Sequence, residues 1–94
     1  MDSIAQTLTS WFPQLTPKAL QAIQSDIAKS AALYPQAHLK LVRDIEDING
    51  FFLEIYKDPK CTLFVASELY DLHLYIELIG KELPQKRHFD PNNF

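Results

Sequence analysis

Hydrophobic and polar residues alternate in two long amphipathic patterns between residues 36 and 83. In the first pattern, apolar residues recur at alternating steps of four and three, which places them on one face of a helix. These residues are Leu41, Ile45, Ile48, Phe52 and Ile55. The second pattern has helical spacing too, and its apolar residues occupy an arc of about 80° without a polar residue in it. Its members are Val65, Leu69, Leu72, Ile76, Ile79 and Leu83. The patterns predict two long helices, at about 36–57 and 59–83.

The join between the two predicted helices lies at Asp58-Pro59. Proline disfavours a helical conformation in the residue that precedes it, so the first helix is expected to end before Pro59. Aspartate is a good N-cap and proline suits the first helical position, so the second helix is expected to begin there. The two helices would then form an antiparallel hairpin with their apolar faces together.

Two shorter helices are predicted before this hairpin. In the first, the apolar residues between Ile4 and Phe12 share one face and end before Pro13. The second opens with the cap-and-proline pair Thr16-Pro17 and runs to about Tyr34. The sequence therefore predicts an all-α fold, a small helical bundle in a single domain over residues 1–94. Residues 84–94 have no periodicity and are expected to form an irregular C-terminal arm.

An α+β fold is the alternative. The segments GFFLEIY and CTLFVA flank KDPK as two strands flank a turn, and they predict a hairpin near 51–66. Apolar and polar residues also alternate with period two between Leu72 and Leu78. The helical interpretation is favoured here, because the apolar arcs continue over about twenty residues and strands of that length are unusual.

Two acidic pairs lie within the predicted helix hairpin: Asp44 with Asp47, and Glu68 with Asp71. Each pair has the spacing i, i+3, which makes its members neighbours on a helix face. With a rise of about 1.5 Å per residue, Asp47 and Glu68 lie roughly 15 Å from the turn and the other two acids roughly 20 Å. The pairs are displaced from their apolar stripes in the same rotational sense. Four carboxylates are therefore expected to converge on one flank, where a cation would relieve their repulsion.

Composition and charge narrow the function classes. The chain is 47% hydrophobic and 22% charged, which suits a folded protein, and its net charge of −3 argues against duplex DNA or an anionic membrane as partner. No run approaches the roughly 18 apolar residues that span a bilayer. The single cysteine, Cys61, forms no internal disulfide, and the first residues lack the pattern of a signal peptide, so we expect a cytoplasmic protein.

Several large apolar residues fall outside the two core stripes. Exposed together, they would make an unusually apolar surface for a monomer, so we expect a homodimer or another protein partner. These residues are Phe51, Leu53, Leu63, Phe64, Tyr70, Leu74, Tyr75 and Leu78.

The segments LVRDIEDI and SELYDLHLYIELIGKEL resemble the all-α nucleoside triphosphate pyrophosphohydrolases, the MazG-like superfamily. The signature of that superfamily is an E-E-x-x-E helix and an E-x-x-D helix whose acids bind magnesium. Glu68 and Asp71 match the second helix. Asp44 and Asp47 stand where glutamates are expected, and Arg43 stands in place of the leading glutamate. The resemblance implies a magnesium-dependent nucleotide pyrophosphohydrolase with these four acids as its catalytic and metal-binding residues.

The predicted geometry also suggests where a nucleotide would bind. Magnesium is commonly held by a few carboxylates together with substrate phosphates, and the bound metal can orient a water for in-line attack. On the helix hairpin, Phe51 and Phe64 would be level with each other as a stacking platform for the base. Lys40 and Tyr75 would be level on the far side of the acids, near the outer phosphate. The alternative function is a non-catalytic helical interaction module, such as an adaptor, inhibitor or immunity-type protein, and the arginine at position 43 favours it.

Overall fold

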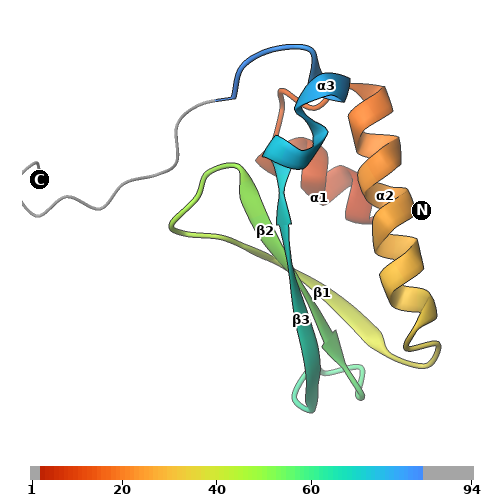
Figure 1. The fold of residues 1–94 in the computed structure, drawn as a ribbon. Coiled ribbons are helices and arrows are strands. Elements are labelled where there is room, and N and C mark those ends of the chain that lie inside the picture. Colours follow the sequence, from red (N-terminus) through yellow and green to blue (C-terminus); the bar gives the residue numbers. More distant parts are fainter. Residues whose placement is uncertain (1–2, 84–94) are drawn as a thin grey trace, which may run out of the picture.

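The computed structural model describes residues 3–83 of the chain, and these residues form a mixed α/β fold. Helices α1 (Ser3–Trp11) and α2 (Pro17–Ala32) are followed by strands β1 (His38–Arg43), β2 (Gly50–Tyr56) and β3 (Phe64–Asp71). A 3₁₀ turn, η1 (Leu72–Tyr75), and the one-turn helix α3 (Ile76–Ile79) complete the described part. The strands form one antiparallel sheet in the order β1-β2-β3, and both helices lie on the same side of it (Figure 1).

The two N-terminal helices agree with the sequence prediction. Thr16 has an extended backbone, and its hydroxyl oxygen accepts a hydrogen bond from the backbone N–H of Ala19 at 3.1 Å, while Pro17 occupies the first turn of α2. Cap and proline are both local signals, so they identify the start of a helix without any knowledge of the rest of the fold.

The predicted helices at 36–57 and 59–83 are wrong, and so is the all-α bundle built on them. These residues form the three strands and the short helical segments η1 and α3. The alternative hairpin near 51–66 is the prediction that matches, because β2 and β3 pair in antiparallel fashion across it.

Burial alternates from one residue to the next along β2, as expected for a strand with one face on the core. Phe51, Leu53 and Ile55 have no exposed surface, whereas the residues between them, such as Phe52 and Glu54, lie on the other face and are half-buried. Aromatic and β-branched side chains fit this pleated surface well. The apolar stripe of the predicted helix is divided accordingly, and its member Ile45 is 78% exposed.

Asp58 shapes the connection between β2 and β3. The Asp58 carboxylate accepts hydrogen bonds from the backbone N–H groups of Thr62 and Leu63, both at 2.8 Å, and a third from the Thr62 hydroxyl. The Thr62 hydroxyl and then the Leu63 N–H hold the pKa of Asp58 below its usual value, because they stabilise the charged carboxylate. Cys61 in the same turn has a φ of +56°, a left-handed conformation that non-glycine residues seldom adopt. The predicted N-cap aspartate therefore caps a turn instead of a helix.

The core lies between the sheet and the two helices. Phe51 is at its centre: its ring stacks on Tyr70 with centroids 5.0 Å apart and an interplanar angle of 6°, and it contacts Phe12 of the segment after α1 with centroids 6.0 Å apart. The buried apolar residues are Leu8, Phe12, Ala19, Ile23, Ile27, Phe51, Leu53, Ile55, Tyr70, Leu72, Tyr75 and Ile79.

A hydrogen bond joins α3, near the end of the described residues, to the start of α2. The Thr16 hydroxyl donates to the carbonyl oxygen of Leu78 at 2.7 Å, so one side chain both caps α2 and holds α3. Gly80 then ends α3 with a φ of +74°, as glycine commonly does after a helix. The C-terminal arm predicted at 84–94 lies outside the described residues. None of the helices within residues 3–83 is long and apolar enough to cross a membrane.

Candidate functional site

Asp44 and Asp47, predicted to bind magnesium, build the connection between β1 and β2. One carboxylate oxygen of Asp44 accepts the backbone N–H of Glu46 at 2.9 Å, and one of Asp47 accepts the N–H of Asn49 at 2.9 Å. These are the local bonds by which aspartate stabilises turns. The carbonyl oxygen of Asp47 also accepts the N–H of Gly50 at 3.0 Å. Both acids therefore have a structural role in this turn.

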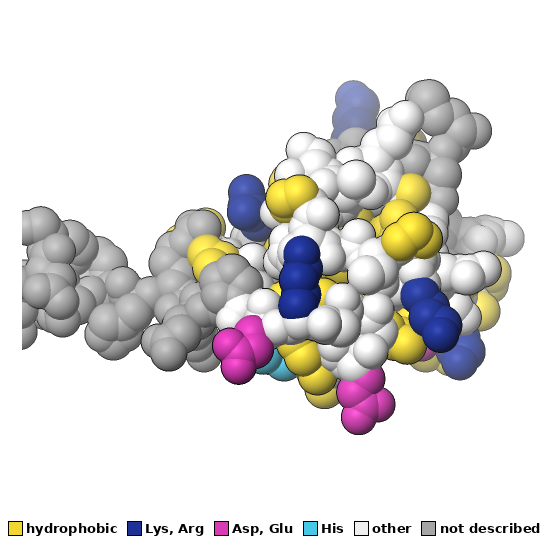
Figure 2. Space-filling model, turned by 90° about the horizontal axis from the view of Figure 1, so that it is seen from above, with side chains coloured by type: hydrophobic (Ala, Val, Ile, Leu, Met, Phe, Trp, Pro, Cys, Tyr) yellow, Lys and Arg dark blue, Asp and Glu magenta, His cyan; other side chains and the backbone are white. Residues whose placement is uncertain are grey.

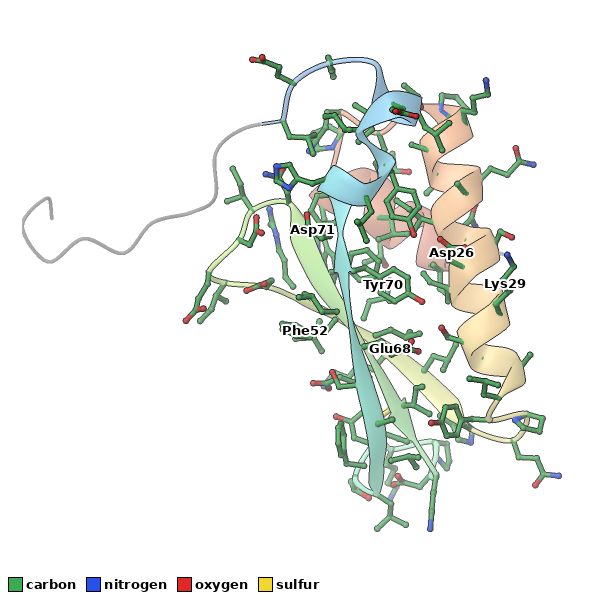
Figure 3. The ribbon with its side chains drawn as sticks, viewed as in Figure 1. Asp26, Lys29, Phe52, Glu68, Tyr70 and Asp71 are labelled. Atoms are coloured by element: carbon green, nitrogen blue, oxygen red, sulfur yellow. The ribbon has the colours of Figure 1, made fainter. Side chains whose placement is uncertain are left out.

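Glu68 and Asp71, the other predicted metal ligands, lie on strand β3. Residues three apart on a strand point to opposite faces, whereas on a helix they would be neighbours. Glu68 points toward the side of α2 (Figure 3). Asp71 caps η1, where its carboxylate accepts the backbone N–H of His73 at 3.0 Å and contacts the His73 ring Nδ1 at 2.8 Å.

The four predicted metal ligands are brought together only in part. Asp71 pairs in register with Gly50, and the N–H of Asp44 bonds to the Gly50 carbonyl, so Asp44 and Asp71 flank the same glycine at one end of the sheet. Glu68 is three residues away along β3 on the other face. Within residues 3–83, no group of three or more His, Cys, Asp and Glu side chains has an arrangement that could hold a metal ion.

The predicted nucleotide-binding residues divide between the two faces of the sheet. Phe51 is in the core, stacked on Tyr70, and Tyr75 is buried with its hydroxyl bonded to a carboxylate of α2. Lys40 is exposed on β1, in register with Glu54, and Phe64 is 58% exposed at the start of β3. The stacking platform of Phe51 and Phe64 is therefore absent, because the two rings belong to different environments.

Two hydrogen bonds that the sequence did not indicate join α2 to the end of the sheet. The Tyr75 hydroxyl donates to Asp26 at 2.5 Å, and the hydroxyls of Ser30 and Tyr70 lie 3.1 Å apart. Burial is the largest cause that raises the pKa of both tyrosines, and the bond to Asp26 raises that of Tyr75 further. Both phenols are therefore kept in the neutral, hydrogen-bonding form.

The outer face of the sheet, the face turned away from α1 and α2, is the remaining candidate site. Figure 3 shows Phe52 on this side of the strands and Tyr70 on the side of α2. The residues that alternate with the core residues define it: His38, Lys40, Val42, Phe52, Glu54, Tyr56, Phe64, Ser67 and Leu69.

Three rows cross the outer face, because residues in register on neighbouring strands lie side by side. The first row is apolar and joins Val42, Phe52 and Leu69, of which Leu69 is 59% exposed. The second row is polar and joins Lys40, Glu54 and Ser67. The third row joins His38, Tyr56 and Phe64.

The polar and aromatic rows are linked through Tyr56. Its hydroxyl donates to Glu54 at 2.6 Å, and this bond is the largest cause that raises the pKa of Tyr56 to about 12. Its ring meets that of Phe64 edge to face with centroids 5.8 Å apart. The outer face therefore presents fixed aromatic and apolar groups beside the charged pair Glu54 and Lys40.

Half of the surplus apolar residues that led us to expect a homodimer are accounted for by the core. Phe51, Leu53, Tyr70 and Tyr75 are buried, and Leu63, Phe64 and Leu74 are more than half exposed. Seen from above, the molecule shows acidic and basic side chains that stand apart from one another with apolar side chains between them (Figure 2).

No family model, curated protein or solved structure matches this chain.

Proposed function

We propose that this protein is a non-catalytic protein–protein interaction module that docks a partner on the outer face of its sheet. The observation that carries the proposal is the apolar row of Val42, Phe52 and Leu69. Helices α1 and α2 cover the opposite face and leave this row uncovered among residues 3–83, with Leu69 59% exposed. An apolar strip rimmed by polar groups is typical of protein interfaces.

The occupant that we propose is a different protein. Three strands at a spacing of about 4.8 Å and a length of about 20 Å give a face of roughly 300 Å². A stable interface needs about 800 Å² on each partner, so two copies stacked through this face alone would bury too little. A larger partner can extend beyond the face and reach neighbouring exposed residues.

The magnesium-dependent reaction receives less support from the geometry. Its signature places the acids on two adjacent helices, whereas here Asp44 and Asp47 lie in a turn and Glu68 and Asp71 point to opposite faces of a strand. We therefore propose the alternative function from the sequence, the interaction module, which the arginine at position 43 also favours. The chain has a single cysteine and forms no internal disulfide, so we also propose that the protein is cytoplasmic.

The test replaces one exposed apolar residue on the outer face and a matched one elsewhere. Leu69→Lys changes the apolar row, and Leu33→Lys changes a residue that is 74% exposed at the end of α2. A partner isolated from the source cells should lose binding to the first variant and keep it with the second, and cross-links should map to the outer face. Equal melting temperatures would show that both variants are folded.

Three outcomes would contradict the proposal. A partner that binds Leu69→Lys normally, or that cross-links only to α1 and α2, would place the interface elsewhere. A sedimentation mass of two copies that Leu69→Lys reduces to one would show a homodimer on this face. Metal-dependent release of pyrophosphate from a nucleoside triphosphate would show an enzyme.

A further inference from the structure

Strand β1 is one of the two edges of the sheet, and its outward backbone groups can be identified from its pairing with β2. The N–H of Asp44 bonds to the carbonyl of Gly50 at 3.2 Å, and this pair continues the register of the two strands. Hydrogen-bonded pairs alternate in an antiparallel ladder, so Val42 and Lys40 bond to β2. The N–H and C=O groups of Leu39, Leu41 and Arg43 therefore point away from β2 at the open edge.

The two edges of the sheet carry opposite charges. Strand β1 contains Lys40 and Arg43, both exposed, and no acid. Strand β3 contains Glu68 and Asp71 and no base. The chain as a whole has a net charge of −3, so a basic edge is a local departure from its overall charge. Glu54 lies beside Lys40 in register, and it also accepts the Tyr56 hydroxyl.

An apolar hollow of about 240 Å³ lies beside β1 on the side of the helices. A strand added to the edge would direct every second side chain to this side of the sheet, and one of them could enter the hollow at the level of Leu39. The hollow is large enough for an aliphatic side chain. It is lined by Ile4, Gln24, Ile27, Ala28, Ala31 and Leu39.

We propose that the β1 edge binds an extended acidic segment of another protein, which adds a fourth strand to the sheet. Main-chain hydrogen bonds to Leu39, Leu41 and Arg43 would hold it, as in other cases of strand addition. On the helix side of the sheet, an apolar side chain fills the hollow at Leu39 and an acidic side chain lies beside Arg43. A second acidic side chain lies beside Lys40 on the outer face. This surface shares only Lys40 with the outer face, so the inference goes beyond the proposed function.

A second copy of the chain is a poor occupant of this edge. If β1 paired with itself across a two-fold axis, Lys40 would lie diagonally from its own copy on the same face of the sheet. Like charges on neighbouring strands are destabilising, and lysine on an edge strand is a common device against self-pairing. An acidic strand has the opposite charge and meets neither obstacle.

The test uses a six-residue peptide of glutamate and valine, matched to the length of β1, with glutamates placed opposite Lys40 and Arg43 and a valine opposite Leu39. We expect saturable binding with NMR shifts confined to β1 and to the residues that line the hollow. The double variant Lys40→Glu with Arg43→Glu should weaken binding about tenfold or more, with little change for the matched control Lys18→Glu with Lys81→Glu. Ala28→Leu should weaken binding without a change of charge, because it fills the hollow.

Further probes decide between this inference and its alternatives. A lysine–valine peptide should not bind, and a glutamate–valine peptide with N-methylated amides should bind far more weakly, since it cannot pair with the edge. Absence of binding by the glutamate–valine peptide, equal binding of its N-methylated form, or an equal effect of the control variant would overturn the inference. Tighter binding of a single-stranded oligonucleotide would show that the basic strand recognises phosphate. Leu69→Lys should leave peptide binding unchanged, which separates this result from that of the outer face.

Discussion

The hydrogen bond between Tyr75 and Asp26 should stabilise the docking of α2 against the end of the sheet, and Tyr75→Phe removes only its donor. Tyr75 is 9% exposed and donates to Asp26 at 2.5 Å. A hydrogen bond to a charged group contributes about 1.5–3 kcal/mol, and water can replace part of it because Asp26 is half-buried. We therefore expect a loss of about 1.5 kcal/mol, which lowers the melting temperature of a domain this small by roughly 6–12 °C.

A double-mutant cycle separates this bond from other effects of the substitutions. Tyr75→Phe and Asp26→Ala should each destabilise the protein, and the double variant should lose about 1 kcal/mol less than the sum of the two, as measured by urea unfolding. The pair Ser30→Ala and Tyr70→Phe is the matched control, because its bond joins two neutral hydroxyls and should show a smaller coupling. Simple additivity of Tyr75→Phe and Asp26→Ala would refute the reasoning.

The same bond predicts a dependence on alkaline pH. Burial, and then the bond to Asp26, raises the pKa of Tyr75 above that of an exposed tyrosine. As the pH rises, the Tyr75 hydroxyl therefore loses its proton at a lower pH in the unfolded chain than in the folded one. The stabilisation is complete below about pH 10 and is lost as the pH rises toward the higher pKa of the folded state. Unfolding free energies between about pH 8 and 11 should fall more steeply for the wild type than for Tyr75→Phe. Identical slopes would contradict this assignment.

Three further predictions concern the core, the cap and the metal. Phe51→Ala should lower the free energy of unfolding, measured by chemical denaturation, by about 3–5 kcal/mol. Phe52→Ala should lower it clearly less, because only Phe51 is fully buried. Equal losses would mean that the outer face is covered. Asp71→Ala should remove the cap of η1 and lower the free energy of unfolding by about 0.5–2 kcal/mol. Hydrogen exchange should increase locally at the backbone N–H of His73. Unchanged exchange there would show that the cap is dispensable. Millimolar magnesium should leave the melting temperature unchanged, since Glu68 and Asp71 point to different faces. If magnesium raised the melting temperature and Glu68→Gln removed that rise, the result would support the metal site predicted from the sequence.

The helical half of the fold could be predicted because its signals are local. Thr16 and Pro17 mark the start of α2 within two positions, and the apolar residues that follow repeat with one period only. No contact with the remainder of the chain is needed to interpret them. The boundary at Ala32 lies close to the predicted end at Tyr34, as expected for a helix that ends before Pro35.

The strands were misassigned because their sequence satisfies two periods at once. In GFFLEIY nearly every residue is apolar, so a step of two and an alternation of three and four both find apolar residues. Periodicity alone cannot separate a buried strand from a helix in such a segment. The aromatic and β-branched composition favours the strand, and Asn49-Gly50, at the start of the strand, is a turn signal.

The four predicted acids do not all converge for a related reason, since three of them are aspartates. A short carboxylate reaches the backbone N–H groups of the next few residues, and Asp44, Asp47 and Asp71 each accept one two residues further on. Asp58 makes the same kind of bond to Thr62. Aspartate in place of the expected glutamate was therefore a sign of turns, and it was available from the sequence.

The two surfaces proposed for binding depend on strand register, which no local signal determines. Val42, Phe52 and Leu69 form one row only because β1, β2 and β3 pair as they do. A slip of one residue would turn Phe52 toward the helices and expose Leu53 in its place. The buried ring of Phe51, stacked on Tyr70 and packed on Phe12, opposes that slip. The packing of the core thus sets which side chains the outer face presents, and the same register directs the backbone groups of Leu39, Leu41 and Arg43 to the open edge.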